Sequence, residues 1–183
     1  MKVTRTPISG VVLIDLEVHG DKRGYFLECY RRSRYAELGL DIEFVQDNRS
    51  FSLKGIVRGM HYQVRHPIGH LVTVTRGRVF DVGVDLRVGS QTFGKHVAIT
   101  LEAERHQQLY LPPGIAHGFC SLADENEIFY KCTDYYFPED EAGVLWNDPD
   151  LGIPWPLVSP VINPRDAAFP RLKQLDPTRL PRV

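Results

Sequence analysis

The sequence predicts a mostly β protein whose strands close into a barrel or a sandwich. Three observations support this prediction. Short runs of alternating apolar and polar residues recur along the 183 residues, glycine and proline separate these runs throughout, and only one segment has a convincing helical pattern. Strands that are apolar on one face need closure or a second sheet to bury those faces. We therefore expect a double-sheet β-barrel with short helices.

The expected strands follow one another with turn residues between them. The clearest pair lies on either side of Arg76-Gly77, within residues 69–87. Similar runs predict strands at 11–18, 24–30, 44–51, 56–63, 95–101, 107–111, 117–122 and 127–136. The one expected helix covers 32–38 and is closed by Gly39. The Pro-rich segment from Gly152 onward is expected to lie over the barrel without a regular element of its own.

Length, charge and cysteine content limit the classes of function. A chain of 183 residues suits one core, so we expect residues 1–183 to form a single domain. The formal net charge of −1 argues against nucleic acid or an anionic membrane as a partner. No apolar run approaches the roughly 20 residues of a membrane helix, and no export signal is visible. Three cysteines without Cys-x-x-Cys spacing fit reduced thiols in the cytoplasm.

Four histidines lie in or beside expected strands, at positions 61, 70, 96 and 117. Most strand histidines are structural, but Pro112-x-Gly114-x-x-His117 resembles the second motif of the cupins, small jelly-roll barrels. Metal-binding cupins need three or more nitrogen and oxygen ligands that converge on one point. Here His61 has no second histidine two residues later, so at most two plausible ligands exist. We expect neither a metal nor a cofactor.

Catalysis by side chains alone needs a base, an acid and a group that holds developing negative charge. Strict alternation would place Arg58 and His61 on opposite faces of their strand, but a bulge at Gly59 would bring both into one cavity. Alternation also gives one shared face to Tyr130, Cys132, Asp134 and Tyr136. These two tyrosines either fill the core or provide a proton donor and a stacking surface.

Motifs in a fixed order run along nearly the whole chain. They include DKRG at 21–24, FVQDN at 44–48, VRGMHYQ at 57–63, PGIAHGF at 113–119 and WNDP at 146–149. Together they resemble the dTDP-4-dehydrorhamnose 3,5-epimerases of L-rhamnose biosynthesis, the RmlC family. This resemblance implies a cupin-like jelly-roll isomerase that uses no cofactor. Such an enzyme would invert C3 and C5 of dTDP-4-keto-6-deoxy-D-glucose by proton abstraction and reprotonation.

The resemblance also implies roles for individual residues. His61 would be the base, oriented by Asp166 and facing the acid Tyr130. Further side chains would bind substrate: Arg23, Arg58 and Arg165 the diphosphate, Glu28, Gln46, Asn48 and Glu141 the nucleobase or ribose, Phe26 and Tyr136 the pyrimidine ring, and His117 the sugar. In the family, the segment that holds Arg23 and Glu28 comes from a partner subunit. We therefore expect a homodimer with strand exchange near the N-terminus.

One position departs from the family. Gly69 is followed by His70 where the family most often has lysine. An imidazole can donate a hydrogen bond, but it holds no permanent positive charge. This departure leaves open a mono-epimerase that inverts only C3 or only C5 of a related nucleotide sugar. A metal-dependent cupin and a non-catalytic sugar-nucleotide binding module are the alternatives from other classes.

Overall fold

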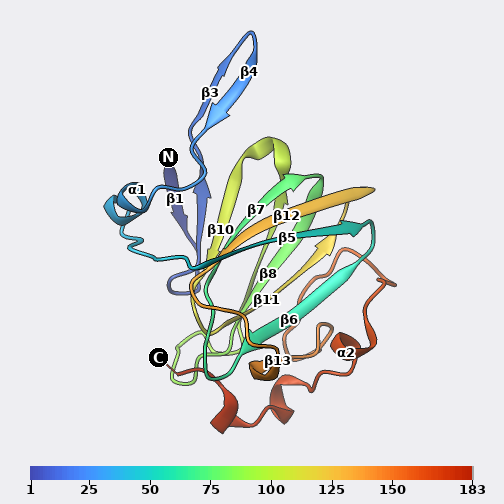
Figure 1. The fold of residues 1–183 in the computed structure, drawn as a ribbon. Helices are drawn as coiled ribbons and strands as arrows, with labels where there is room; N and C mark the ends of the chain where they lie inside the picture. Colours follow the sequence, from blue (N-terminus) through green and yellow to red (C-terminus); the bar gives the residue numbers. More distant parts are fainter. Residues whose placement is uncertain (183) are drawn as a thin grey trace.

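The protein consists of two facing antiparallel β-sheets from which one hairpin projects; the computed structural model describes residues 1–182 (Figure 1). The larger sheet has the strand order β1 (Lys2–Arg5), β2 (Val12–Asp15), β10 (Gln107–Leu111), β7 (His70–Arg76), β12 (Glu125–Cys132) and β5 (Gln46–Leu53). The smaller sheet has the order β13 (Glu141–Gly143), β6 (Val57–Gln63), β11 (Ile115–Ser121), β8 (Arg78–Asp85) and β9 (His96–Glu102). The predicted double-sheet β architecture is confirmed.

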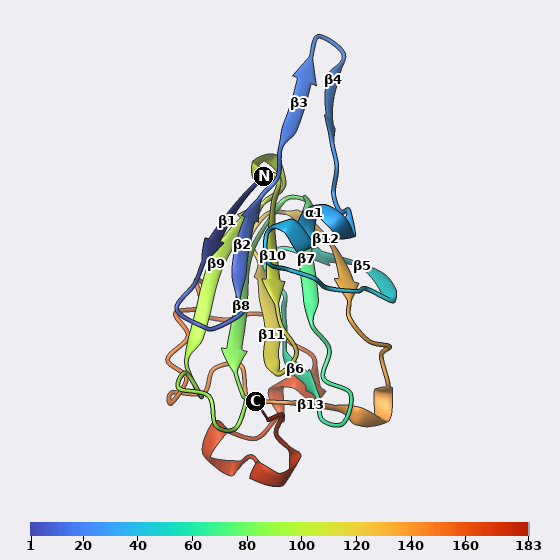
Figure 2. The same ribbon diagram turned by 90° about the vertical axis from the view of Figure 1, so that its left-hand side faces the viewer.

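The hairpin of β3 (Val18–Asp21) and β4 (Gly24–Leu27) extends away from both sheets in two perpendicular views (Figures 1 and 2). It corrects the prediction of one strand over 11–18, because the chain leaves the sheet after Asp15 and pairs again only within the hairpin. The expected strand 127–136 also ends early, at Cys132. There the chain turns back toward Gly69, whose N–H donates to Oγ1 of Thr133 at 2.7 Å.

The helices are short. They are α1 (Arg32–Glu37), α2 (Pro164–Ala167) and the 3-10 helices η1 (Ala103–Arg105), η2 (Pro138–Asp140), η3 (Leu172–Gln174) and η4 (Pro177–Arg179). The prediction that the segment after Gly152 lacks regular elements was therefore wrong. Pro164 and Pro177 each begin a helix, where the missing N–H costs nothing, and side chains of Asn163 and Asp176 cap the first turns. None of the helices within residues 1–182 combines the length and apolar character needed to cross a membrane.

Three apolar clusters explain why the central strands are buried on both faces. The first lies between the sheets and includes Val72, Leu109 and Leu101. The second covers the outer face of the smaller sheet with the C-terminal segment, and the third covers the outer face of the larger sheet with α1 and its neighbours. The space between the sheets is therefore the interior of the molecule, and one part of it remains open as a cavity.

Asp85, at the end of β8, holds the following loop through a buried network. Its carboxylate accepts hydrogen bonds from Nε of Arg87 at 2.8 Å and from the hydroxyls of Ser90 and Thr92, each at 2.6 Å. Burial by itself raises the pKa of Asp85, but these bonds outweigh burial and lower the pKa to about 2. The charged carboxylate therefore stabilises the fold above about pH 4, and this contribution is lost as the pH falls toward 2.

We expect Asp85→Asn to lower the free energy of unfolding by about 2 kcal/mol at pH 7, because the variant lacks the charge that this network stabilises. The difference from wild type should shrink as the pH falls from about 4 to about 2. Chemical denaturation at a series of pH values measures it. Asp124→Asn removes a carboxylate that is 96% exposed and should have almost no effect. A difference that does not change with pH would contradict this explanation.

Candidate active site

A cavity of about 430 Å³ opens between the two sheets. Strands β5, β7 and β12 of the larger sheet line one side, and β6, β11 and β13 of the smaller sheet line the other. Polar side chains that the sequence analysis singled out converge here from both sides: Gln46, Asn48, Arg58, His61, His70, His117, Tyr130, Tyr136 and Glu141. The fourth strand histidine, His96, lies elsewhere, with its Nδ1 2.9 Å from the carbonyl oxygen of Leu151.

A bulge in β6 brings Arg58 and His61 into the same cavity. His117 of β11 is the register partner of His61, and Phe119 is the partner of Arg58, so Gly59 and Met60 together face only one residue of β11. The extra residue reverses the alternation and turns both side chains inward. The predicted bulge at Gly59 is confirmed, and the alternation that would have separated these two residues is broken there.

Glycine at two facing positions allows this bulge. Gly59 has φ +118°, a conformation that side chains disfavour, and a Cβ on it would lie 2.5 Å from Cα of Gly118. A Cβ on Gly118 would in turn lie 2.6 Å from Sδ of Met60 and 2.8 Å from the carbonyl oxygen of Arg58. The two strands therefore approach closely only because neither residue has a side chain.

His61 forms a pair with Asp166, which α2 brings in from the C-terminal segment. Nε2 of His61 lies 2.9 Å from Oδ1 of Asp166, and Asp166 is fully buried. Its other oxygen accepts the N–H of Gly59 at 3.1 Å, and its own N–H donates to Oδ1 of Asn163 at 2.8 Å. The bulge and the imidazole are thus both bound by one carboxylate.

The charge of Asp166 is favoured in this position. Burial by itself raises the pKa of Asp166, but the hydrogen bonds from His61 and Gly59 and the charge of Arg165 outweigh it, so the net pKa lies below the usual value. A carboxylate only accepts hydrogen bonds, so Nε2 of His61 carries a proton and Nδ1 is the free nitrogen. The site therefore presents an imidazole whose tautomer is set by its partner.

Glu141 and Arg165 lie beside this pair. Oε1 of Glu141 is 3.7 Å from Nδ1 of His61, while Oε2 accepts hydrogen bonds from the hydroxyl of Tyr136 at 3.0 Å and from Nη1 of Arg165. The ring of Phe169 packs edge-on against His61, with 5.7 Å between the ring centroids. The sequence analysis missed Phe169, because a lone aromatic residue in a Pro-rich segment carries no local signal of function.

Tyr130 approaches from the opposite sheet. It lies on β12, whereas His61 lies on β6 of the facing sheet, and both side chains line the cavity. Burial raises the pKa of Tyr130, so its hydroxyl keeps its proton at neutral pH. Its predicted neighbour on the same face, Asp134, lies beyond the end of β12 with its side chain 42% exposed and does not line the cavity. Tyr136 lines the cavity from the loop that follows β12.

Two further histidines lie deeper in the cavity. The ring of His70 on β7 is 5.4 Å from that of His117 on β11 and 5.6 Å from that of Tyr130. Nε2 of His117 lies 3.0 and 3.1 Å from the two carboxylate oxygens of Asp81, which is fully buried on β8. Asp81 was not among the expected site residues. The sequence contains one signal that could have identified it. Asp81 interrupts the apolar run Val79-Phe80-Asp81-Val82, and a carboxylate buried in such a strand needs a partner.

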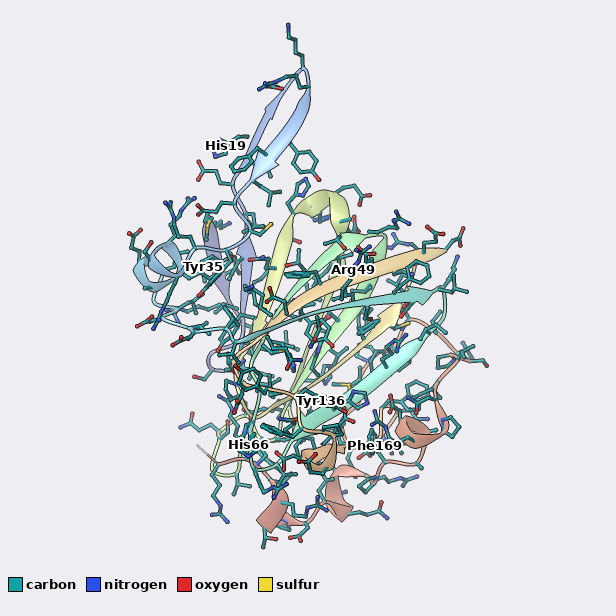
Figure 3. All side chains as sticks on the ribbon, viewed as in Figure 1. His19, Tyr35, Arg49, His66, Tyr136 and Phe169 are labelled. Carbon is teal, nitrogen blue, oxygen red and sulfur yellow. The ribbon has the colours of Figure 1, made fainter. Side chains whose placement is uncertain are left out.

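Three expected substrate-binding residues lie away from this cavity. Arg23 on the hairpin turn binds Asp21, Phe26 is 69% exposed, and Glu28 pairs with Arg31 and Arg34. Figure 3 shows the separation: the hairpin residue His19 lies at one end of the molecule, whereas Tyr136 and Phe169 lie toward the other end, near β13 and α2. Within one chain, the hairpin and the cavity are separate.

Among residues 1–182, no three His, Cys, Asp or Glu side chains are arranged to hold an ion. His61 and His117 each direct one ring nitrogen to a buried carboxylate instead.

Comparisons with known proteins agree on one family. Residues 5–174 match the family model described as dTDP-4-dehydrorhamnose 3,5-epimerase. The Pseudomonas aeruginosa protein of that name is 48% identical over 91% of this chain and 93% of its own. The structure of RmlC from Legionella pneumophila, solved in complex with dTDP-4-keto-L-rhamnose, superposes with a TM-score of 0.96 at 45% identity, covering 100% of this chain and 98% of that one. A dTDP-4-dehydrorhamnose 3-epimerase from Streptomyces niveus is 43% identical over 91% of this chain and 81% of its own.

We expect Gly118→Ala to lower the free energy of unfolding by about 1 to 3 kcal/mol, because the new Cβ would force β6 away from β11. The same displacement should change the NMR signals of the His61 and His117 rings. Gly20→Ala is the matched control, since its Cβ would meet only the carbonyl oxygen of Gly24 at 3.8 Å. A variant at position 118 as stable as the control would contradict the tight contact between these strands.

Proposed function

The chain belongs to the dTDP-4-dehydrorhamnose 3,5-epimerase family and is an isomerase; from this premise we propose that its cavity inverts C3 and C5 of dTDP-4-keto-6-deoxy-D-glucose with its own side chains. One observation carries the proposal. His61, paired with Asp166 of α2, faces the cavity from the smaller sheet, and Tyr130 faces it from the larger sheet. Inversion needs a base and an acid on opposite faces of the sugar ring. A ring bound between the sheets would have His61 on one face and Tyr130 on the other.

His61 begins the reaction. The ketone at C4 makes the hydrogens on C3 and C5 acidic, because the electrons left behind are delocalised onto the ketone oxygen. Nδ1 of His61 takes the proton, and the carboxylate of Asp166 stabilises the imidazolium through the bond to Nε2. The second nearby carboxylate, Glu141, lies 3.7 Å from Nδ1 and favours the same charge.

Tyr130 completes the inversion. Its hydroxyl gives a proton to the carbon from the other face, and the ketone re-forms. Burial, which raises the pKa of Tyr130, keeps the phenol protonated until the strongly basic enolate carbon accepts the proton. The phenolate and the imidazolium then return to their starting states by exchange with water.

Several residues around the cavity suit the nucleotide. Arg58 and Arg165 supply guanidinium groups for a diphosphate, and Gln46 and Asn48 supply amides for the nucleobase or ribose. Tyr136 offers an aromatic face at the cavity, and its side chain is 43% exposed.

We further propose that the protein acts as a homodimer in which the β3–β4 hairpin of each chain completes the cavity of its partner. Two features of the hairpin support this. Tyr25 and Phe26 are 65% and 69% exposed, which is unusual for adjacent aromatic residues. Arg23, whose guanidinium suits a diphosphate, is 84% exposed and contacts only the neighbouring Asp21 among residues 1–182.

A cytoplasmic location is also part of the proposal. Cys29, Cys120 and Cys132 are all free thiols, as expected in a reducing compartment.

A mono-epimerase is the second candidate function, and His70 is the observation that favours it. The family's usual lysine would hold a permanent charge beside the reacting sugar, whereas burial lowers the pKa of His70 to about 3 and keeps it neutral. Weaker stabilisation of the enolate could restrict inversion to one carbon. The Streptomyces niveus relative is a dTDP-4-dehydrorhamnose 3-epimerase.

Incubation of the protein with dTDP-4-keto-6-deoxy-D-glucose in deuterated water should exchange the protons at C3 and C5, as observed by NMR. His61→Ala should slow exchange by at least about 10²-fold, because the base is lost. Tyr130→Phe should still permit exchange through His61 but slow inversion by a similar factor. The control is His66→Ala, an exposed histidine outside the cavity. Exchange at one carbon only selects the mono-epimerase, and full turnover in folded His61→Ala protein would contradict the proposal.

Mixing two impaired variants tests the exchanged hairpin. Arg23→Ala and His61→Ala homodimers should regain turnover when subunits are mixed, because one site of the mixed dimer then has both wild-type residues. His61→Ala mixed with Tyr130→Phe is the control, since both residues belong to the same chain's cavity and no intact site can form. Sedimentation measures the dimer itself. Failure of the first mixture to gain activity, in dimers shown to exchange subunits, would contradict the shared site.

A further inference from the structure

Gln63 lies on β6 two residues after His61 and lines the same cavity, yet it is only 4% exposed. Three main-chain groups bind its side-chain amide. Oε1 accepts the N–H of Phe137 at 2.6 Å, and Nε2 donates to the carbonyl oxygens of His66 at 2.8 Å and Tyr135 at 3.3 Å. Both hydrogens of Nε2 are therefore engaged, and the amide has no donor left for a molecule bound in the cavity.

Two of these bonds hold the main chain on either side of Tyr136. The carbonyl group of Tyr135 and the N–H of Phe137 belong to the two peptide groups that flank it. In an extended chain these two groups point to one side, and the N–H of the residue between them points to the other side. Consistent with this geometry, the N–H of Tyr136 donates to Oε1 of a second glutamine, Gln46, at 3.1 Å. Tyr136 is thus held by two glutamine amides in a segment that is neither strand nor helix.

The third bond connects Gln63 to a loop that is fixed independently. The carbonyl oxygen of His66 is a main-chain group, so any residue at that position provides it. The N–H groups of Arg65 and His66 donate to the buried carboxylate of Asp140 at 2.9 and 2.8 Å. A flipped amide would bring Oε1 of Gln63 against two carbonyl oxygens, so the orientation of the amide is also determined. Gln63 is therefore a fixed support between this loop and the chain around Tyr136.

The side chain of Tyr136 depends on such a support. Its ring lines the cavity but is 43% exposed, so packing alone holds it less firmly than it would hold a buried ring. Its hydroxyl donates to Oε2 of Glu141 at 3.0 Å. With the hydroxyl bound at one end and the main chain bound at the other, the aromatic face has one orientation before any ligand enters.

We propose that Gln63 is a positioning residue for nucleotide binding, which acts through Tyr136 and does not itself touch the substrate. By binding both peptide groups next to Tyr136, it presents that ring to the nucleotide in advance. A segment that is already ordered loses less conformational entropy when the ligand binds, and affinity rises for that reason. The inference rests on the proposed function, in which Tyr136 offers its aromatic face to the nucleotide.

Gln63→Glu tests the support, because glutamate keeps the shape but has no donor for the two carbonyl oxygens. We expect the calorimetric Kd for dTDP and the KM for dTDP-4-keto-6-deoxy-D-glucose to rise about 10-fold. The kcat at saturating substrate should stay within about threefold of wild type, because the pair of His61 and Asp166 is intact.

Gln107→Glu is the matched control. It also removes an Nε2 donor, in this case the one that binds Oδ1 of Asp15 at 2.7 Å, but it lies outside the cavity. Its Kd for dTDP should stay within about twofold of wild type, since no residue of the nucleotide site depends on it. A Kd for Gln63→Glu equal to that of this control would overturn the proposal.

A double-mutant cycle shows whether Gln63 acts through Tyr136. In a Tyr136→Ala background, Gln63→Glu should change the Kd for dTDP by less than about twofold, because no ring remains to be positioned. The same rise in both backgrounds would overturn the proposal. Gln63→Met removes all three hydrogen bonds without adding a charge. It must show the same rise in Kd, and it replaces Gln63→Glu if that variant fails to fold.

Calorimetry with dTDP does not depend on turnover, so this inference and the proposed function fail separately. If the wild type binds dTDP but exchanges no sugar protons, epimerisation fails, and the affinities of the variants still decide the role of Gln63. A wild-type protein that does not bind dTDP would overturn both.

Discussion

The hydrogen bond between His61 and Asp166 joins residues that are 105 positions apart, and the site depends on it. Through this bond the C-terminal segment is attached to β6. The same carboxylate also binds the N–H of Gly59, within the bulge that turns Arg58 and His61 into the cavity. One carboxylate therefore both orients the imidazole of His61 and stabilises the bulge. The cap from Asn163 to the N–H of Asp166 holds α2 in the conformation that delivers the carboxylate.

The two-sheet architecture explains why this chain suits an inversion. Apolar clusters cover the outer faces of both sheets, so the polar groups of the cavity can meet only in the space between them. His61 of the smaller sheet and Tyr130 of the larger sheet, the proposed base and acid, then lie on opposite sides of a ring bound in the cavity. A site built on one sheet alone would present both groups to the same face of the sugar.

Three histidines in one cavity differ because their partners differ. His61 binds Asp166, His117 binds Asp81, and His70 has no acidic partner among the described residues. Identical side chains thus have different surroundings in one cavity: two are paired with buried carboxylates, and the third is kept neutral by burial, which lowers its pKa to about 3.

Local patterns in the sequence determined most of the secondary structure and the bulge of the candidate site. Apolar alternation predicted the strands on either side of Gly77, Gly39 predicted the end of α1, and the spacing of Arg58, Gly59 and His61 predicted the bulge. The resemblance of ordered motifs then identified the family. Each of these signals depends on residues that are close together in the chain, or on motifs read in order.

Only the tertiary structure decided which distant residues meet. It paired His117 with Asp81, packed Phe169 against His61, and separated Arg23 from the cavity of its own chain. These contacts follow from strand order and from the path of the C-terminal segment, which long-range packing selects. A sequence pattern shows which face of a strand a residue occupies, but it does not show which residue of another strand lies opposite.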